Sequence, residues 1–209
     1  MNVILFDFWG TLIENGVWSP TKQVQHTLRI NLPFSEFIVR MERAMMTSPF
    51  STLSEAFEQI CTSFEIPPTQ RDIDYLVGMW NKSWMLAKPY EEVFETLENL
   101  KKTHKLVLMS NTDNFSVNRV LEKYKMAPLF DAMFLSYEVG MIKTDPEFIN
   151  HVLKTLQVEP KDCLLIGDSM QSDIEPAQRV GIKAILIDRK NKREVEEKIT
   201  NLRQIKEYL

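Results

Sequence analysis

The sequence predicts an α/β fold in which a parallel five-stranded sheet is flanked by helices and carries an inserted all-helical domain. The first observation is a set of five short apolar runs that show no alternation of apolar and polar residues. A strand that is covered on both faces has this pattern. The runs are Val3–Phe8, Leu106–Ser110, Ala132–Ser136, Cys163–Gly167 and Ala184–Ile187. The second observation is that helical patterns lie between the later runs, and the third is a long gap between the first two.

Two segments between the predicted strands have helical patterns. In Tyr90–Lys101 the apolar residues recur at the spacing of one helix face. Pro146–Leu156 follows an aspartate that can cap the helix, and it has proline at the first helical position. Strands that alternate with helices imply right-handed crossovers and therefore a Rossmann-like parallel sheet. The charged segment Arg189–Lys198 is interpreted as the solvent-exposed face of a further helix.

The gap between the first two strands predicts an insert. The 97 residues between Phe8 and Leu106 far exceed the length of one crossover helix. Prolines separate four amphipathic patterns in this gap, and each pattern predicts a helix. The predicted helices are Thr21–Leu28, Phe34–Met46, Ser54–Phe64 and Thr69–Trp80. We therefore expect an α/β core domain of residues 1–16 and 89–209, and a helical cap domain of residues 17–88 over the mouth of the sheet.

Large apolar side chains in the insert permit two interpretations. They either form the hydrophobic core of the insert or line a substrate pocket. The residues concerned are Met41, Met45, Met46, Trp80 and Trp84. Residue type alone leaves both interpretations open.

Composition argues against several classes of function. The chain has 25 Lys and Arg against 29 Asp and Glu, and this net charge of −4 does not favour a nucleic-acid partner. The apolar runs are too short to span a membrane, and the first one lacks the flanks of a signal peptide. Cys61 and Cys163 form no metal-binding pattern, and we expect them to be buried thiols in a reducing, cytoplasmic location. A monomer and a homodimer are both compatible with the sequence.

Polar residues that can perform chemistry follow three of the predicted strands. Asp7 follows the first, where a buried carboxylate is costly unless a cation or several donors compensate it. Ser110 and Asn111 follow the second and offer donors to a phosphate oxygen. Asp168 follows the fourth, with Asp173 five residues later. Ligands bind at the carboxyl ends of parallel strands, and oxygen-only ligands favour Mg²⁺ over Zn²⁺.

These residues occur in an order that resembles the haloacid dehalogenase (HAD) superfamily. Its four motifs are matched, in order, by Asp7-Phe8-Trp9-Gly10-Thr11, by Ser110, by Lys143 ahead of Asp145-Pro146, and by Gly167-Asp168 with Asp173. Taken alone, Lys143 would be interpreted as a solvent-exposed loop residue and Asp7 as a structural carboxylate. The resemblance covers nearly the whole chain, and the insert lies where this family places its α-helical C1-type cap.

The resemblance implies a phosphatase in which the carboxylate of Asp7 attacks phosphorus and forms an aspartyl-phosphate. Lys143 would neutralise developing charge. The phosphate subsite would comprise Ser110, Asn111 and Thr11, with Thr11 steadying the first loop rather than reacting. Mg²⁺ is the implied cofactor, and its implied ligands are Asp7, the backbone carbonyl of Trp9, Asp168 and Asp173. The implied substrate is a small phosphorylated metabolite.

One position departs from the phosphatases of this family. They usually carry a second aspartate two residues after the nucleophile, which protonates the leaving oxygen and then activates water. Here that residue is Trp9, whose indole N–H donates a hydrogen bond but cannot transfer a proton near neutral pH. Loss of a general acid–base costs roughly 10²–10⁴ in rate. Aryl and acyl phosphates, which have good leaving groups, should therefore be favoured unless another residue donates the proton.

This departure leaves three further interpretations. The 2-haloacid dehalogenases of the superfamily also lack that aspartate and need no metal, but they generally lack the acid pair found here. Phosphonoacetaldehyde hydrolases lack the aspartate, keep the metal and need a cap lysine that forms an imine; the lysines available by position are Lys22, Lys82 and Lys88. The third is a binding module that keeps Mg²⁺ and a phosphate ligand but turns over little.

Overall fold

The structure is a computed structural model, and it describes residues 2–209. Its main sheet has six parallel strands in the order β5-β4-β1-β6-β7-β8. They are β1 Val3–Phe6, β4 Lys105–Ser110, β5 Ala132–Leu135, β6 Cys163–Gly167, β7 Lys183–Ile187 and β8 Lys198–Ile199. The α/β fold class is thereby confirmed, with one strand more than the five predicted. The added strand, β8, has two residues, which is too short for a pattern to reveal.

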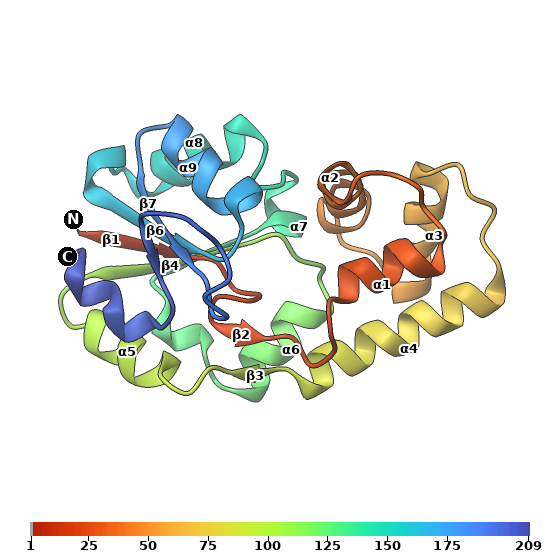
Figure 1. The fold of residues 1–209 in the computed structure, drawn as a ribbon, viewed down its shortest axis with the longest axis horizontal. Helices are drawn as coiled ribbons and strands as arrows, with labels where there is room; N and C mark the ends of the chain where they lie inside the picture. The colour runs from red at the N-terminus through yellow and green to blue at the C-terminus, as the bar shows by residue number, and fades with distance from the viewer. Residues whose placement is uncertain (1) are drawn as a thin grey trace.

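Helices cover both faces of this sheet (Figure 1). The helices of the α/β part are α5 Val93–Leu100, α6 Ser116–Lys123, α7 Ser136–Val139, α8 Pro146–Leu156 and α9 Glu175–Arg179. Alternate residues of β1 belong to separate hydrophobic cores. Ile4 and Phe6 pack with α5 and α6, whereas Val3 and Leu5 pack with α8 and α9. Since both faces of β1 are buried, its sequence is apolar throughout.

The segment between β1 and β4 is helical. Its helices are α1 Pro20–Thr27, α2 Phe34–Met46, α3 Leu53–Ser63 and α4 Gln70–Leu86. The hydroxyls of Thr52 and Thr69 cap α3 and α4. These helices enclose a hydrophobic core of their own, in which Met41 and Met45 are fully buried. A two-stranded antiparallel sheet, β2 Ile13–Glu14 with β3 Lys88–Pro89, joins the chain where it enters and leaves this insert.

The insert lies beyond the carboxyl ends of the sheet strands (Figure 1). Polar contacts hold it against the α/β part. Arg43 on α2 pairs with Asp145, the residue before α8, at 2.6 Å. Phe50, between α2 and α3, exchanges two hydrogen bonds of 3.1 Å with the side chain of Asn114. The insert is therefore docked over the edge of the sheet where the polar residues of the predicted site are expected.

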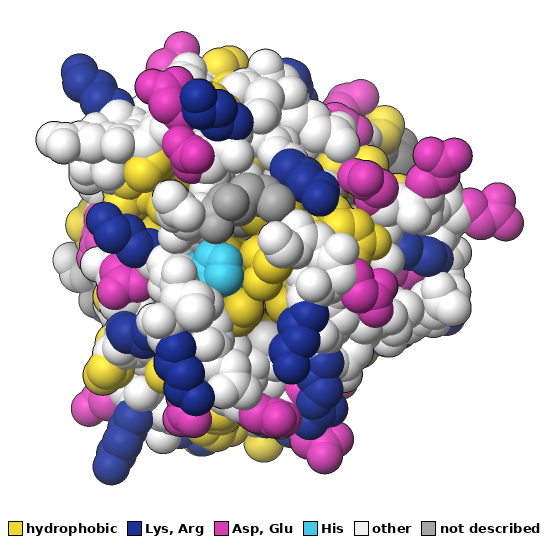
Figure 2. Space-filling model, turned by 90° about the vertical axis from the view of Figure 1, so that its left-hand side faces the viewer, with side chains coloured by type: hydrophobic (Ala, Val, Ile, Leu, Met, Phe, Trp, Pro, Cys, Tyr) yellow, Lys and Arg dark blue, Asp and Glu magenta, His cyan; other side chains and the backbone are white. Residues whose placement is uncertain are grey.

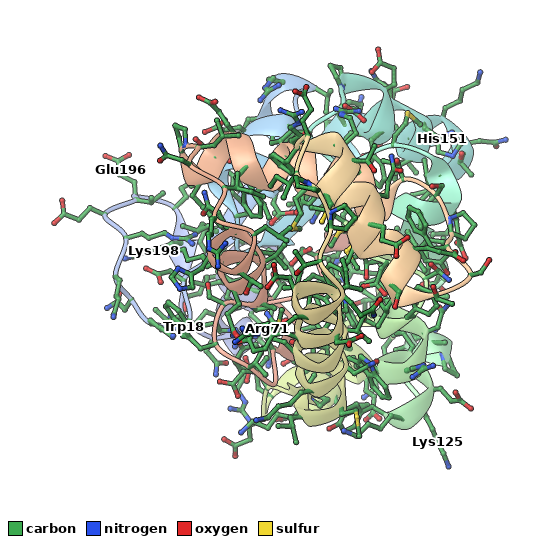
Figure 3. The ribbon with its side chains drawn as sticks, turned by 90° about the vertical axis from the view of Figure 1, so that its right-hand side faces the viewer. Trp18, Arg71, Lys125, His151, Glu196 and Lys198 are labelled. Carbon is green, nitrogen blue, oxygen red and sulfur yellow. The ribbon has the colours of Figure 1, made fainter. Side chains whose placement is uncertain are left out.

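The helix predicted for Arg189–Lys198 is wrong. This segment forms a loop that leads into β8, and Figure 3 shows Glu196 and Lys198 on it at the edge of the molecule. The carboxylate of Asp188 accepts a hydrogen bond of 2.6 Å from the N–H of Arg193 and pairs with Lys198 at 3.5 Å. Because the segment has no apolar stripe to bury, helix formation would gain little. The C-terminal end of the segment instead pairs with β7 as strand β8.

Charges of both signs alternate on the face opposite the insert. Figure 2 shows Lys and Arg side chains interspersed with Asp and Glu there, whereas nucleic-acid-binding faces usually gather basic side chains in one patch. Across residues 2–209, none of the helices has both the length and the apolar character that a bilayer crossing requires.

Candidate active site

The topology of the sheet places Asp7 at the centre of one edge. β1 is paired with β4 on one side and with β6 on the other, and Phe6 is in register with Leu108 and Ile166. The N–H of Asp7 continues the ladder with a 2.9 Å bond to the carbonyl of Ile166. The chain leaves β1 toward β4 on one side and later returns to β6 on the other. In open parallel sheets, ligands bind at such a switch point.

The loop after β1 orients the carboxylate of Asp7. This residue is only 6% exposed, and the hydroxyl of Thr11 donates a 2.8 Å hydrogen bond to its Oδ2. Gly10 has φ of +81°, and a Cβ at this position would lie 2.3 Å from Oδ2 of Asp168. A side chain is therefore excluded by both the backbone conformation and the close approach of the acid after β6. The predicted steadying role of Thr11 has a physical basis in its bond to Asp7.

Lys143 is buried between two carboxylates. Its Nζ lies 2.6 Å from Oδ1 of Asp7 and 2.5 Å from Oδ1 of Asp173. Burial opposes the charge of the ammonium group, but the carboxylates of Asp173 and Asp7 outweigh burial and raise the pKa of Lys143 above its usual value. The ammonium group thus provides a fixed positive charge at the tip of β1.

Asp7, Asp168 and Asp173 form one acidic cluster. Each offers a carboxylate oxygen, and these oxygens lie within 4.8 Å of one another. Burial, together with repulsion from Asp7 and Asp173, raises the pKa of Asp168 well above its ordinary value. Burial also raises the pKa of Asp173 to about 6, although Lys143 opposes this shift. Asp7 and Asp173 are buried and Asp168 is partly buried. With one ammonium group among three carboxylates, the cluster has an excess of negative charge.

This donor set fits a magnesium ion. All three side chains offer hard oxygen atoms, which Mg²⁺ prefers, and no His or Cys takes part in the cluster among residues 2–209. Burial chiefly raises the pKa values of Asp168 and Asp173, and repulsion from the neighbouring carboxylates adds to the shift; a divalent cation would relieve this repulsion. We therefore expect Asp7, Asp168 and Asp173 to hold the ion. The carbonyl of Trp9 as a further ligand stays a prediction.

A methyl group at Gly167 is expected to disrupt this cluster. A Cβ at Gly167 would lie 2.3 Å from Cγ of Asp173, so Asp173 would have to move. Gly167→Ala should lower the free energy of unfolding by about 1–3 kcal/mol and reduce the rise in melting temperature that Mg²⁺ produces. Gly78→Ala is the control, because a Cβ at Gly78 on α4 would meet no atom within 4 Å in residues 2–209 apart from its own neighbours and the backbone of its helix. It should be neutral or stabilising; equal effects of the two substitutions would contradict this account.

Ser110 and Asn111, two residues of the predicted phosphate subsite, lie at the carboxyl end of β4 and differ in their position relative to the cavity. Ser110 is fully buried and does not line the cavity at the acidic cluster, so its role as a phosphate ligand stays a prediction. Asn111 lines that cavity. Its Oδ1 accepts the N–H of Lys143 at 2.8 Å, and its Nδ2 donates to Oε2 of Glu42 on α2 at 2.7 Å. The side chain of Asn111 therefore connects the α/β part with the insert.

Trp9 is fixed beside the acidic cluster. Its Nε1 donates to the hydroxyl of Thr112 at 3.2 Å, and its ring packs edge-on against Phe8 with centroids 5.0 Å apart. The indole N–H is thereby occupied by the protein. Trp9 forms part of the cavity wall but supplies no group that could exchange a proton near neutral pH.

Glu42 lines two of the cavities that lie between the α/β part and the insert. The catalytic cavity, about 460 Å³, is lined by Asp7, Lys143, Asp168 and Asp173 among others. The second cavity, about 200 Å³, has aromatic and polar walls; they include Trp9, Asn15, Glu42, Met46, Trp80, Trp84 and Asp113. Met41, Met45, Met46 and Trp80 belong to the hydrophobic core of the insert, and Met46, Trp80 and Trp84 also line the second cavity. The core interpretation is thus confirmed for four of these residues, and the substrate-pocket interpretation stays a prediction.

Glu42 is the main site residue that the sequence analysis missed. It is partly buried and borders both cavities. A signal for it exists in the sequence, because Glu42 interrupts an i, i+4 row with Ile38 and Met46 on α2. A carboxylate within an apolar row indicates a specific partner. That partner, Asn111, lies 69 positions away and cannot be inferred from local pattern.

The three candidate imine-forming lysines differ in position. Lys22 lines the catalytic cavity, with its Nζ 5.2 Å from the ring centroid of Phe34. Lys82 and Lys88 do not line it, and Lys88 is largely exposed beside Glu14. The structure therefore leaves Lys22 as the candidate from this set.

Comparison of the sequence with known proteins identifies a family model and a relative that match most of the chain. Residues 4–187 match the family model described as haloacid dehalogenase-like hydrolase. The pyrophosphatase PpaX of Bacillus thuringiensis (strain Al Hakam) is 27% identical over 191 residues, which span 90% of this chain and 83% of that protein.

Two solved structures have a similar fold. An HAD phosphatase from Thermococcus onnurineus has a TM-score of 0.65 at 21% identity, over 100% of this chain and 97% of that one. A 2-haloacid dehalogenase from Pseudomonas syringae pv. Tomato DC3000 also has a TM-score of 0.65 at 21% identity, over 99% and 97% of the two chains. Because proteins of different activity share this fold, the likeness does not decide the reaction. The match over residues 4–187 does decide the family, and the chain belongs to the haloacid dehalogenase-like hydrolases.

Proposed function

We propose that the protein is a Mg²⁺-dependent phosphatase that hydrolyses a small phosphorylated metabolite through an aspartyl-phosphate on Asp7. The observation that carries this proposal is the meeting of Asp7, Lys143 and the acid pair Asp168 and Asp173 around one cavity. The relative PpaX is a pyrophosphatase, which supports phosphoryl transfer as the class of reaction.

The contacts of Asp7 support its role as the nucleophile. Thr11 and Lys143 hold one carboxylate oxygen each, so the group has a defined orientation toward the catalytic cavity. The charge of Lys143 would stabilise negative charge that develops on the phosphoryl oxygens. Bound Mg²⁺ would supply charge neutralisation between the carboxylate and the phosphoryl group. Residues 17–88 would act as a cap that excludes water from this cavity.

The acid pair favours this function over the dehalogenase alternative. A metal-independent dehalogenase has no use for a cluster of three carboxylates, two of them buried, whose repulsion is costly without a cation. The position of Lys22 in the catalytic cavity keeps phosphonoacetaldehyde hydrolysis as a second candidate, because an imine on Lys22 would form in the cavity that Asp7 also lines. Borohydride trapping with phosphonoacetaldehyde, followed by peptide mapping, would detect this reaction at Lys22.

Phosphate release should depend on Mg²⁺. We expect the purified protein to release inorganic phosphate from one or more members of a panel of acyl, aryl and sugar phosphates and pyrophosphate. Chelation of divalent ions should abolish this release, and added Mg²⁺ should restore it, because the acidic cluster repels the substrate when no cation is bound. A colorimetric phosphate assay with and without EDTA makes the measurement.

Three other results would each contradict the proposal. Metal-independent release of halide from a 2-haloacid would indicate a dehalogenase. Tight binding of phosphate esters without turnover would indicate a binding module. Phosphate release that EDTA does not affect would exclude the magnesium role of Asp7, Asp168 and Asp173.

A further inference from the structure

We propose that Glu42, on helix α2 of the insert, donates a proton to the leaving-group oxygen and later accepts one from water, and that the second cavity holds the leaving group. This inference rests on the proposed phosphatase function and deepens it. It assigns a donor to a site whose Trp9 cannot provide one.

The two cavities have a common border where the scissile bond would lie. The residues that line both are Trp9, Ser19, Thr21, Glu42 and Asn111. A phosphoryl group beside Asp7 occupies the catalytic cavity, and the alcohol part of the substrate extends into the second. The oxygen that joins the two parts must then lie near these border residues.

Helix α2 runs along this border. Ile38 lines the catalytic cavity, Glu42 lines both cavities and Met46 lines the second. Residues four apart on a helix are about 6 Å apart along its axis, so the three side chains follow the path of an extended substrate. Glu42 occupies the middle position of this row.

A relay of two hydrogen bonds fixes the carboxyl group of Glu42. Asn111 is held by the N–H of Lys143 and in turn donates to Oε2 of Glu42 at 2.7 Å. The other oxygen, Oε1, makes no hydrogen bond to the protein within residues 2–209. One oxygen therefore sets the position of the group, and the other remains available to a substrate.

Among the border residues, only Glu42 can exchange a proton near neutral pH. The indole of Trp9 is a donor only, and its N–H is engaged by Thr112. Ser19 and Thr21 carry hydroxyls and Asn111 carries an amide, and none of these groups ionises in this range. Glu42 is therefore the one of the five border residues that can serve as the proton donor.

The surroundings of Glu42 suit a general acid. Burial chiefly raises the pKa of Glu42 to about 7; Lys143 and the bond from Asn111 oppose this shift, and Asp173 and Asp7 add to it. A catalytic acid is most effective when its pKa is near the working pH. The charged residues that line the two cavities with Glu42 are Asp7, Lys22, Asp113, Lys143, Asp168, Asp173 and Arg193.

The two half-reactions balance with water as the sole co-reactant. In the first, a carboxylate oxygen of Asp7 bonds to phosphorus, the bond from phosphorus to the leaving oxygen breaks, and the Glu42 proton passes to that oxygen. In the second, a water molecule attacks phosphorus, ionised Glu42 takes its proton, and the bond to Asp7 breaks. Phosphate leaves, and Asp7 and protonated Glu42 are restored.

The test compares the parent with Glu42→Gln on aryl phosphates whose leaving groups range from dinitrophenol to phenol. Proton donation matters little for dinitrophenol and much for phenol. We expect Glu42→Gln to lower kcat/KM for phenyl phosphate by about 10²–10⁴-fold and to leave dinitrophenyl phosphate within about threefold of the parent. The plot of log kcat/KM against leaving-group pKa should be steeper for the variant. A single-turnover burst of dinitrophenol, which is released before dephosphorylation, also reports that the variant is folded.

The pH profile gives a second readout. Because the acid must be protonated, activity of the parent on phenyl phosphate should decline as pH rises through about 7, the pKa of Glu42. This limb should disappear in Glu42→Gln. Glu36→Gln is the matched control, since Glu36 lies on the same helix, is exposed and lines neither cavity.

Two outcomes would overturn the inference while leaving the phosphatase function intact. One is an equal loss of kcat/KM on all aryl phosphates. The other is an unchanged slope of log kcat/KM against leaving-group pKa. In both cases the Asp7→Asn variant is inactive. If Asp7→Asn is fully active, the proposed function itself fails, and the two failures are thereby distinguished.

Discussion

Replacement of Asp7 by asparagine is expected to lower phosphate release by on the order of 10⁴–10⁶-fold, the usual loss when a covalent nucleophile is removed. The amide oxygen of asparagine can still accept the 2.8 Å bond from Thr11, so the first loop should keep its conformation. The amide is, however, a poor nucleophile, and it carries no charge for Mg²⁺ or Lys143. Initial rates and acid-quenched single turnovers make the measurement. In the parent, the peptide that contains Asp7 should gain the mass of one phosphoryl group.

The control for this substitution is Asp74→Asn. Asp74 is exposed on α4 and contacts Gln70 at 2.8 Å, so its loss should leave turnover within about twofold of the parent, as expected for a surface site away from the cavities. Persistent turnover in Asp7→Asn, or a phosphoryl group found on another residue, would mean that Asp7 is not the nucleophile.

Replacement of Lys143 by methionine should have the largest effect on stability. It would leave the carboxylates of Asp7 and Asp173 without the ammonium group that now lies 2.6 and 2.5 Å away. Removal of one partner of a buried ion pair typically costs about 3–5 kcal/mol. Chemical denaturation would measure the loss. Activity should also be lost, because the charge that faces the phosphoryl group is absent.

The effect of Lys143→Met should depend on pH. Burial already raises the pKa of Asp173 to about 6 in the presence of Lys143, and loss of the lysine raises it further. A carboxyl whose folded-state pKa lies above its unfolded value of about 4 favours folding in its protonated form, so stability is lost as pH rises. The deficit should therefore be larger at pH 8 than at pH 5, and added Mg²⁺ should reduce it.

A surface lysine provides the comparison. Lys88 pairs with Glu14 at 3.4 Å with 68% of its side chain exposed, and Lys88→Met should change the free energy of unfolding by less than about 1 kcal/mol. A deficit in Lys143→Met that is as small as that of Lys88→Met, or one that grows toward low pH, would contradict the buried ion-pair description.

The sequence was sufficient for the features that parallel sheets impose. Strands buried on both faces need continuous apolar residues, and their carboxyl ends must meet at one edge. The convergence of Asp7, Asp168 and Asp173 follows from these two facts and the order of the strands. The predicted strands and the helix Pro146–Leu156 could also be predicted, because local periodicity and a proline at the first helical position indicate them.

Features that depend on pairing between distant segments could not be predicted from the sequence. β8 has only two residues, and its strand conformation comes from its bonds to β7. The charged composition of Arg189–Lys198 was interpreted as an exposed helix face, but contacts with Asp188 and β7 decide its conformation. Glu42 became visible as a site residue only through Asn111 and the cavity walls. Local pattern carries no information on which helix of an insert meets which loop of the core.

The bond between Asn111 and Glu42 has a consequence for the order of events in one turnover. Asn111 belongs to the α/β part and Glu42 to the insert, so a movement of the insert away from the sheet would separate them. Asp7 would stay on the α/β part, and Glu42 would move with α2. If the insert moved away before the aspartyl-phosphate was hydrolysed, the base for that hydrolysis would be absent. The lifetime of the aspartyl-phosphate would then depend on how often the insert returns to its position against the α/β part.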